Sequence, residues 1–447
     1  MGDDLLTVAE KLWNGEVSPL EAHPWFQESK LLDFGNNVSF IPSFANVTAV
    51  STADGLVLVD TGSAPLARQV HGIIRTWKPD RLNTAIYSHG HIDHVFGVPV
   101  FEEEGKNIGW PDPVVVAHKD MPARFDRYIR TAGYNSLINQ RQFQLPEFKW
   151  PTVYRYPDTT YDLDLTMTIG GERVELYHAR GETDDHTFTW FPQKRVLCTG
   201  DLFIWASPNA GNPQKVQRYA SEWAQALRKM ITLGPNPPEI LLPGHGVPII
   251  GKERIHQALT DVAEYLESLL DQTLELMNQG AKLNDILHSV KPPQNLLDKP
   301  YLQPVYDEPE FIVRNIFRQY GGWWDGNPST LKPAKEVKIS HELAELAGGA
   351  KKLAQRALDL LNEADELDGN RLFSGGTLPI SGGRIKSEEV EDLLKVASSL
   401  VEFAYVSDPD DKDVCEVRAK VYESLAKAAT STMSKGVYMW AAKESSS

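Results

Sequence analysis

The chain has 447 residues, of which 41% are hydrophobic and 24% are charged, as expected for a globular protein of two or three domains. The formal net charge of −16 argues against a general nucleic-acid-binding protein, and two widely separated cysteines, Cys198 and Cys415, argue against a disulfide framework. Residues 1–5 lack the features of a signal peptide and no apolar run could span a bilayer, so we expect a cytoplasmic protein without a membrane span.

Strand-like runs surround one helix in the N-terminal part of the chain. Asp54-Gly55 is typical of a hairpin turn between two such runs. A helical pattern over residues 65–77 then precedes a buried strand. This strand–helix–strand order is typical of an α/β layer. The strands are expected at residues 37–41, 47–50, 56–59 and 82–87.

A cluster of potential metal ligands directly follows the strand at residues 82–87. The sequence Ser88-His89-Gly90-His91-Ile92-Asp93-His94 places three imidazoles and one carboxylate within six residues. On a tight loop that leaves a strand, these side chains can converge on one or two cations. Zn²⁺ suits such a mixed set of nitrogen and oxygen ligands.

The segment at residues 130–143 concentrates hydrogen-bond donors. One interpretation is a solvated helix or the surface of a lid. The other is a cap that presents Tyr134, Asn139 and Arg141 to an anionic substrate group, because guanidinium donors suit sulfate, phosphate and carboxylate.

Of four further candidate ligands, most lie at or just beyond the C-terminal ends of predicted strands. Side chains at the ends of neighbouring strands can meet at one edge of a sheet sandwich. The candidates are Glu182, His186, Asp201 and His245. The strands are expected at residues 165–169, 173–178, 187–191, 196–201 and 239–242.

After residue 252 the sequence changes to long helical patterns. Residues 254–279 form one continuous amphipathic segment, and several Ala- and Leu-rich helices are expected between residues 340 and 442. Helix pairs of this kind suggest helical hairpins of the tetratricopeptide type, although no strict period is visible. We therefore predict one domain at residues 1–252 and a second, all-α domain at residues 253–447.

The candidate ligands can be assembled into a centre for two zinc ions per chain. Such a centre needs about three protein ligands per ion, often with a bridging carboxylate. His89 and His91 would bind the first ion, and one further ligand for it remains to be found. Asp201 would bridge the two ions. The second ion would be bound by Asp93, His94 and His245.

The arrangement resembles the metallo-β-lactamase superfamily. The H-x-H-x-D-H motif, the later Gly-Asp at residues 200–201 and the Gly-His at residues 244–245 follow in the order typical of that superfamily. The resemblance implies an αββα sandwich for residues 1–252. In most members the missing ligand is the His of a G-H-T-like motif, and the matching position here is Glu182. We favour Glu182 as the ligand, with His186 as its rival.

A glutamate at this position is similar to the alkylsulfatase branch of the superfamily. The bridging position holds Asp201 where that branch often has Glu. Residues 319–331, Gln-Tyr-Gly-Gly-Trp-Trp-Asp-Gly-Asn-Pro-Ser-Thr-Leu, are similar to the signature of the alkylsulfatase dimerisation domain. This resemblance implies that residues 253–447 form a dimerisation domain and that the protein is a homodimer.

Substrate contacts are the least defined part of the resemblance. The alkylsulfatases carry Asn and Arg to the sulfate on the segment after the bridging acid. In this chain Asn209 and Arg218 could serve, alongside Tyr134, Asn139 and Arg141 from the cap segment. The residue-by-residue correspondence remains open.

The leading hypothesis is a dinuclear zinc hydrolase that cleaves alkyl sulfate esters or similar anionic esters with a metal-activated water, with Asp93 and Asp201 as its catalytic carboxylates. A second hypothesis is a metal-dependent hydrolase of a carboxylic ester, a lactone or a phosphoester. A third is a non-catalytic helical scaffold with a vestigial catalytic domain, against which the full set of ligands argues.

Overall fold

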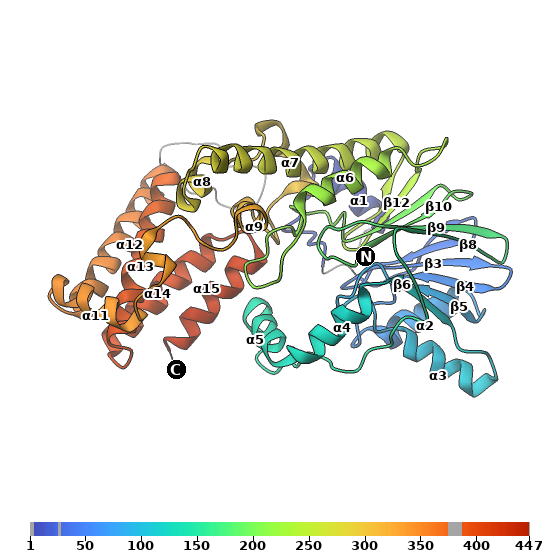
Figure 1. Ribbon diagram of the computed structural model, residues 1–447, viewed down its shortest axis with the longest axis horizontal. Coiled ribbons are helices and arrows are strands. Elements are labelled where there is room, and N and C mark those ends of the chain that lie inside the picture. The colour runs from blue at the N-terminus through green and yellow to red at the C-terminus, as the bar shows by residue number, and fades with distance from the viewer. Residues whose placement is uncertain (1–3, 26–27, 374–386, 447) are drawn as a thin grey trace. The chain divides into compact units, whose positions relative to one another are not determined.

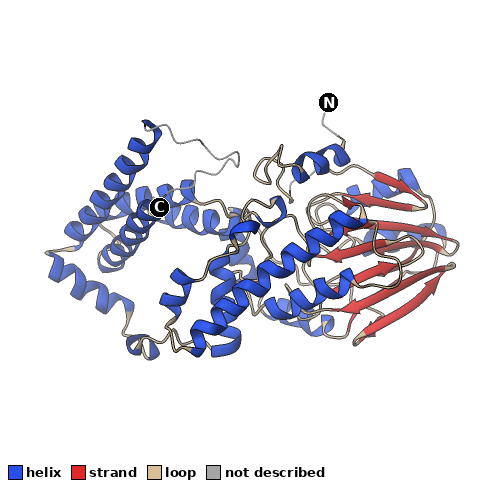
Figure 2. Ribbon diagram, turned by 90° about the horizontal axis from the view of Figure 1, so that it is seen from above, coloured by secondary structure: helices blue, strands red, loops and turns tan. Residues whose placement is uncertain are grey.

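The computed structural model describes residues 4–25, 28–373 and 387–446. The chain forms two compact units. The first contains Met1–Asn135 and Lys149–Trp323, and the second contains Ser136–Phe148 and Trp324–Ser447. Within the described residues, strands (red in Figure 2) occur only in the first unit.

The first unit contains a seven-stranded sheet whose strands follow the order of the chain. Neighbouring strands from β1 to β4 are antiparallel, and those from β4 to β7 are parallel. The four strands predicted in this part of the chain are confirmed as β2 to β5. The strands are β1 (Leu32–Gly35), β2 (Val38–Ile41), β3 (Val47–Thr52), β4 (Gly55–Val59), β5 (Leu82–Ile86), β6 (Val114–His118) and β7 (Thr159–Tyr161).

The second sheet has six strands in the order β13-β12-β11-β10-β9-β8. Only β11 and β12 pair in parallel, and the other pairs are antiparallel. The strands are β8 (Asp164–Ile169), β9 (Glu172–His178), β10 (Thr187–Phe191), β11 (Val196–Gly200), β12 (Ile240–Pro243) and β13 (Ile249–Ile250). They include all five strands predicted between residues 165 and 242.

The two sheets pack face to face around a buried apolar core. Val57 and Val59 of the first sheet and Leu176 and Phe191 of the second belong to this core. Helices α2 (Ala67–Trp77) and α3 (Val98–Ile108) cover the outer side of the first sheet, and α6 (Ala220–Ile231) and α7 (Lys252–Asn278) cover that of the second (Figure 1). The predicted αββα sandwich is therefore confirmed.

The remaining helices of the first unit include several that follow the sandwich in the chain. Helices α7 and α9 share one apolar cluster with α6 and the outer face of the second sheet. The predicted boundary at residues 252 and 253 stays a prediction, and α7 and α9 lie in the compact unit that holds both sheets. The remaining helices of the first unit are α1 (Leu5–Trp13), α4 (Met121–Arg130), α8 (Leu283–Ser289), η1 (Gln294–Leu296), η2 (Pro300–Leu302) and α9 (Pro309–Gly321).

The second unit is helical in its described part, as predicted for the C-terminal region. Helices that are adjacent in the chain pack on one another: α12 on α13, α13 on α14, and α14 on α15. Their core is a separate apolar cluster that includes Ala357, Leu394, Val401 and Val421. The helices are α10 (Pro328–Leu331), α11 (Glu336–Ala347), α12 (Ala350–Phe373), α13 (Glu388–Ser407), α14 (Lys412–Ala428) and α15 (Thr432–Glu444).

A short segment from the middle of the chain also belongs to the second unit. Helix α5 (Ala132–Phe143) begins in the first unit, and Ser136–Phe148 pack with the C-terminal helices. The Gln144 side chain donates a hydrogen bond of 2.8 Å to the carbonyl of Gly436. A Cβ at Gly436 would lie 2.2 Å from the carbonyl oxygen of Gln142, so only glycine allows this approach.

None of the helices formed by the described residues combines the length and the apolarity that a bilayer crossing requires.

The helical core of the second unit can be tested with one buried leucine. Leu394 on α13 is 1% exposed, so Leu394→Ala should lower the free energy of unfolding by about 2–5 kcal/mol through lost burial and a residual cavity. Val396 on the same helix is 50% exposed, and Val396→Ala should change the free energy by less than about 0.5 kcal/mol. Urea denaturation followed by circular dichroism measures both values. Equal effects of the two substitutions would contradict the packing described.

Candidate metal centre

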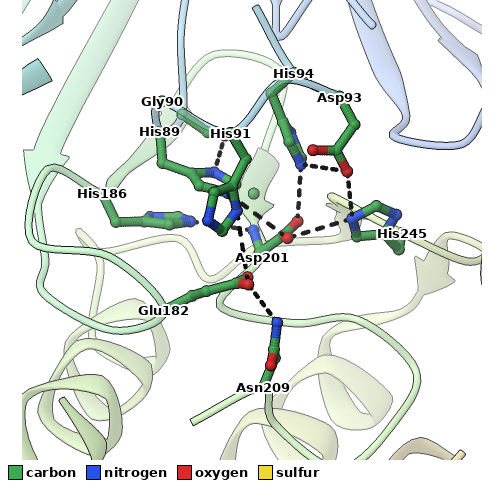
Figure 3. Close-up of polar contacts among 12 residues, drawn as sticks. His89, Gly90, His91, Asp93, His94, Glu182, His186, Asp201, Asn209 and His245 are labelled. Carbon is green, nitrogen blue, oxygen red and sulfur yellow. Dashed lines mark hydrogen bonds and ion pairs between the residues drawn. The ribbon is translucent and has the colours of Figure 1, made fainter. Parts of the chain in front are cut away.

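The candidate ligands lie on loops that leave the C-terminal ends of strands in both sheets. The loop with His89, His91, Asp93 and His94 follows β5 of the first sheet. In the second sheet, Glu182 lies between β9 and β10, Asp201 follows β11 and His245 follows β12. The sandwich brings these strand ends to one edge, where the seven side chains point toward one another (Figure 3).

The first group of ligand atoms comes from His89, His91, Glu182 and Asp201, with all four atoms within 4.8 Å of one another. His89 Nε2 lies 2.7 Å from His91 Nδ1 and 3.8 Å from Asp201 Oδ2. Glu182 Oε1 lies 3.6 Å from His91 Nδ1. His89, Glu182 and Asp201 are buried, and the His91 side chain is 16% exposed. The group is therefore a pocket of donor atoms with one side open.

The second group comes from Asp93, His94 and His245. Asp93 Oδ2 lies 3.6 Å from His94 Nε2 and 3.5 Å from His245 Nε2. Asp201 contacts this group as well, with Oδ1 at 3.4 Å from His94 Nε2 and Oδ2 at 3.3 Å from His245 Nε2. One carboxylate thus lies between the two groups, which is the geometry expected of a bridging ligand.

The spacing of these atoms fits divalent metal ions. Of the seven distances between ligand atoms given above, six are 3.3–3.8 Å. Hydrogen bonds are shorter, whereas donors on a tetrahedral zinc ion, each about 2.0–2.1 Å from the metal, would lie about 3.3 Å apart. His94 Nε2, Glu182 Oε2 and Asp201 Oδ1 are also buried outside any hydrogen bond. Buried polar atoms are seldom left in that state, so the two groups form a candidate site for divalent metal ions.

The far side of three of the four ligand imidazoles is fixed by the protein. His94 Nδ1 lies 2.8 Å from Asp60 Oδ2, His89 Nδ1 lies 3.0 Å from Ser88 Oγ, and His245 Nδ1 contacts the carbonyl of Phe44. Asp60, at the end of β4, has a left-handed φ of 57° and also accepts from the backbone N–H and the hydroxyl of Ser88, both at 2.7 Å. These contacts hold the rings so that their other nitrogens face the centre.

The electrostatics of the centre favour a cation. Burial by itself would lower the pKa of His94, but the carboxylates of Asp201, Asp60 and Asp93 hold that pKa well above its usual range. Burial raises the pKa of Glu182 well above its usual range, against the opposing effect of Arg218. The carboxylates of Asp201, Asp60 and Asp93 are thus confined together around His94. A bound divalent ion would relieve this excess of negative charge.

The geometry separates Glu182 from its rival His186. Among the described residues, the first group contains Glu182 and does not contain His186. The Asp201 backbone N–H donates to His186 Nε2 at 3.1 Å, so that ring nitrogen is already used. The imidazole stacks on His89 with the ring centroids 4.9 Å apart, and burial lowers the pKa of His186 to about 3. His186 therefore lies against the centre as a neutral ring that holds Asp201.

The predicted substrate residues divide into two sets. Asn209 and Arg218 are buried beside the centre, and both contact Glu182 Oε1. Tyr134 on α5 is 60% exposed. Asn139 and Arg141 belong to the second unit, and their contact with substrate stays a prediction.

Three residues near the centre were not predicted as functional. Burial and the Arg218 guanidinium lower the pKa of Lys215 to about 7, and Asp93 and Glu182 also act on this ammonium group. Its Nζ lies 5.2 Å from the ring centroid of Trp150. Asp60 and Asp185 contact the ligand loop through Ser88 and Gly90. In the sequence, only their positions pointed to these two aspartates. Asp60 follows a predicted strand, and Asp185 lies three residues after Glu182.

Two family models match the chain. The metallo-beta-lactamase superfamily matches residues 41–245, and the alkyl sulfatase dimerisation family matches residues 282–367. Together they cover most of the two sheets, α8 and α9, and part of the second unit. The order of the two matches is the order predicted from the motifs.

The curated relatives are sulfatases. A linear primary-alkylsulfatase from Pseudomonas sp. is 25% identical over 347 residues, 71% of this chain and 63% of the relative. An (R)-specific secondary-alkylsulfatase from Pseudomonas sp. is 24% identical over 424 residues, 90% of this chain and 60% of the relative. An alkyl/aryl-sulfatase from Saccharomyces cerevisiae is 25% identical over 338 residues, 70% of this chain and 52% of the relative. The chain thus spans between about half and two thirds of the length of these relatives.

The fold is also similar to a solved structure. The stereoselective inverting sec-alkylsulfatase Pisa1 from Pseudomonas sp. superimposes with a TM-score of 0.79 at 22% identity. The match covers 93% of this chain and 66% of that protein. By its family matches and its relatives, the chain carries a metallo-β-lactamase domain and an alkylsulfatase dimerisation domain, and its homologues are alkylsulfatases.

Proposed function

We propose that this protein is a dinuclear zinc hydrolase that cleaves alkyl sulfate esters or similar anionic esters. The observation that carries the proposal is the pair of buried ligand groups that share Asp201 and lie beside Arg218. The names of the relatives support sulfate as the anion.

The protein would hold two zinc ions with the two groups described above. His89, His91 and Glu182 would bind the first ion, and Asp93, His94 and His245 the second, with Asp201 between them. When bound, zinc ions supply an activated water nucleophile near neutral pH and neutralise charge on the leaving group. Asp93 and Asp201 act as the carboxylates that orient this centre. His186 holds the backbone N–H of Asp201 and thereby fixes its position.

Arg218 favours an anionic substrate. Its guanidinium is buried, and one of its terminal nitrogens donates to the Asn209 carbonyl and contacts Glu182. Its Nε is buried outside any hydrogen bond. Guanidinium donors suit the tetrahedral oxygens of a sulfate group. Arg218, with Asn209 beside it, would therefore bind the sulfate group, and Tyr134, Asn139 and Arg141 stay predicted contacts.

Two other functions are kept as alternatives. A carboxylic ester, a lactone or a phosphoester could use the same metal chemistry, because the superfamily fold does not set the substrate. The buried guanidinium beside the centre favours a negatively charged ester over a neutral one. A non-catalytic helical scaffold would have no need for the two converging ligand groups.

The first prediction concerns the substrate. The zinc-loaded protein should release inorganic sulfate from dodecyl sulfate, because the centre combines metal ligands with a buried Arg218. Ion chromatography measures the release, a chelator should abolish it, and added zinc should restore it. Asp201→Asn, which removes the shared carboxylate charge, should lower the rate by more than the about 10- to 100-fold typical of residues that only support a ligand. Turnover of a chromogenic ester or phosphodiester without sulfate release would contradict the proposal.

The second prediction separates Glu182 from His186. Glu182→Gln should weaken binding of one of the two zinc ions by about 100-fold, because the charged oxygen near His91 is lost. His186→Gln should keep both ions, since the glutamine oxygen can still accept from the Asp201 N–H. Zinc per chain, measured by mass spectrometry after equilibration with a chelator, distinguishes the two. If His186→Gln lost one zinc ion while Glu182→Gln kept both, the ligand would be His186.

The third prediction concerns assembly. We propose a homodimer formed through the C-terminal helical domain, because residues 282–367 match the dimerisation family. Sedimentation equilibrium should give twice the mass of one chain at micromolar concentration. A single species with the mass of one chain would contradict this prediction without affecting the proposed metal chemistry.

A further inference from the structure

Arg124 is a buried cation that the proposed reaction does not use. It lies on α4 and is 3% exposed. Its Nε lies 2.7 Å from Asp185 Oδ1, one of its terminal nitrogens contacts Asp184, and the other donates to the Tyr128 hydroxyl at 3.2 Å. A buried guanidinium with two carboxylates is costly to desolvate. The burial of Arg124 at this position therefore needs a physical explanation.

Asp185 connects this cation to the metal loop. The carboxylate is fully buried, and its second oxygen, Oδ2, accepts from the backbone N–H of Gly90 at 3.0 Å. Gly90 lies between the proposed ligands His89 and His91. The Asp185 carboxylate thus accepts from the Gly90 turn with one oxygen and contacts Arg124 with the other.

The stem of Arg124 also covers this turn directly. A Cβ at Gly90 would lie 2.7 Å from Arg124 Cδ and 3.1 Å from Asp185 Oδ2. No larger residue fits between the turn and the guanidinium unless one of them moves. The turn is therefore packed against Arg124 as well as bonded to Asp185.

The loop that contains Asp184 and Asp185, the two carboxylate partners of Arg124, also carries Glu182, a further proposed ligand of the first ion. Asp184 and Asp185 follow Glu182 in the same loop, and His186 then accepts from the backbone N–H of Asp201. Arg124 thus joins the loop with His89 and His91 to the loop with Glu182. The second group is held by other contacts, from Asp60 to His94 and from Phe44 to His245.

We propose that Arg124 is a positioning residue that sets the affinity of the first ion site, formed by His89, His91, Glu182 and Asp201, while leaving the second site intact. The inference rests on the proposed two-ion centre. Arg124 contacts neither substrate nor a ligand side chain in this scheme. It acts through Asp185 on Gly90, and through the loop on Glu182.

Arg124→Lys tests this inference, because lysine keeps the charge and loses the fork that reaches both aspartates and Tyr128. In zinc-loaded protein titrated with a chelator, the variant should lose one of two ions at about 10- to 100-fold lower chelator concentration than the wild type. Anomalous diffraction at the zinc edge should show the lost occupancy at the first group only. Retention of both ions with unchanged affinity, or equal weakening of both, would overturn the inference.

Two further variants keep the test decisive. Asp185→Asn is isosteric and should give the same selective loss if Arg124→Lys fails to fold. Arg75→Lys is the matched control. Arg75 on α2 pairs with Glu104 on α3 at 2.6 Å, and neither is a proposed ligand, so this variant should bind zinc as the wild type does. If the wild type binds two ions but releases no sulfate, only the proposed substrate is refuted. If the wild type binds no divalent metal, both proposals are wrong.

Discussion

The burial of Asp201 is the constraint on which the rest of the site depends. A carboxylate that is 3% exposed must be compensated by positive charge or by hydrogen bonds. Asp201 has His89, His94 and His245 around its oxygens and His186 on its backbone N–H. The neighbouring position 244 must also be glycine, since a Cβ there would lie 2.0 Å from Asp201 Oδ1. The surrounding loops are arranged so that one charge can face two groups of ligands.

The sandwich makes this arrangement possible because it brings strand ends from two sheets to one edge. β5 delivers the histidine loop from the first sheet, and the parallel pair β11 and β12 delivers Asp201 and His245 side by side from the second. The N–H of Asn46 donates to the Gly244 carbonyl at 2.8 Å and the Asn46 side chain donates to Pro243 at 3.0 Å, which fastens the two sheets next to the site. The geometry of the ligands is therefore a property of the fold and not of any one loop.

The sequence could predict the parts of this site that are local. The pattern at residues 88–94 identifies ligand candidates because its spacing is compact, and Glu182 is favoured because it holds the position of the His in the superfamily's G-H-T-like motif. Supporting contacts such as Asp60 with His94 and Arg124 with Asp185 join residues 34 and 61 positions apart, and no periodic pattern marks them. The same limit explains why the assignment of residues 136–148 to the second unit was not predicted: a helical pattern does not say which core a helix joins.

The boundary between a catalytic and a dimerisation domain is also less sharp in the packing than in the family matches. Asn315 on α9 lies within the matched dimerisation segment, and its side chain donates to the carbonyls of Ala210 at 2.9 Å and Arg218 at 2.8 Å. Asp307 accepts from the backbone N–H of Gly211 at 2.6 Å. These contacts support the loop that carries Asn209 and Arg218 to the metal centre. Because part of the matched dimerisation segment holds this loop in place, that part of the segment belongs physically to the proposed active site.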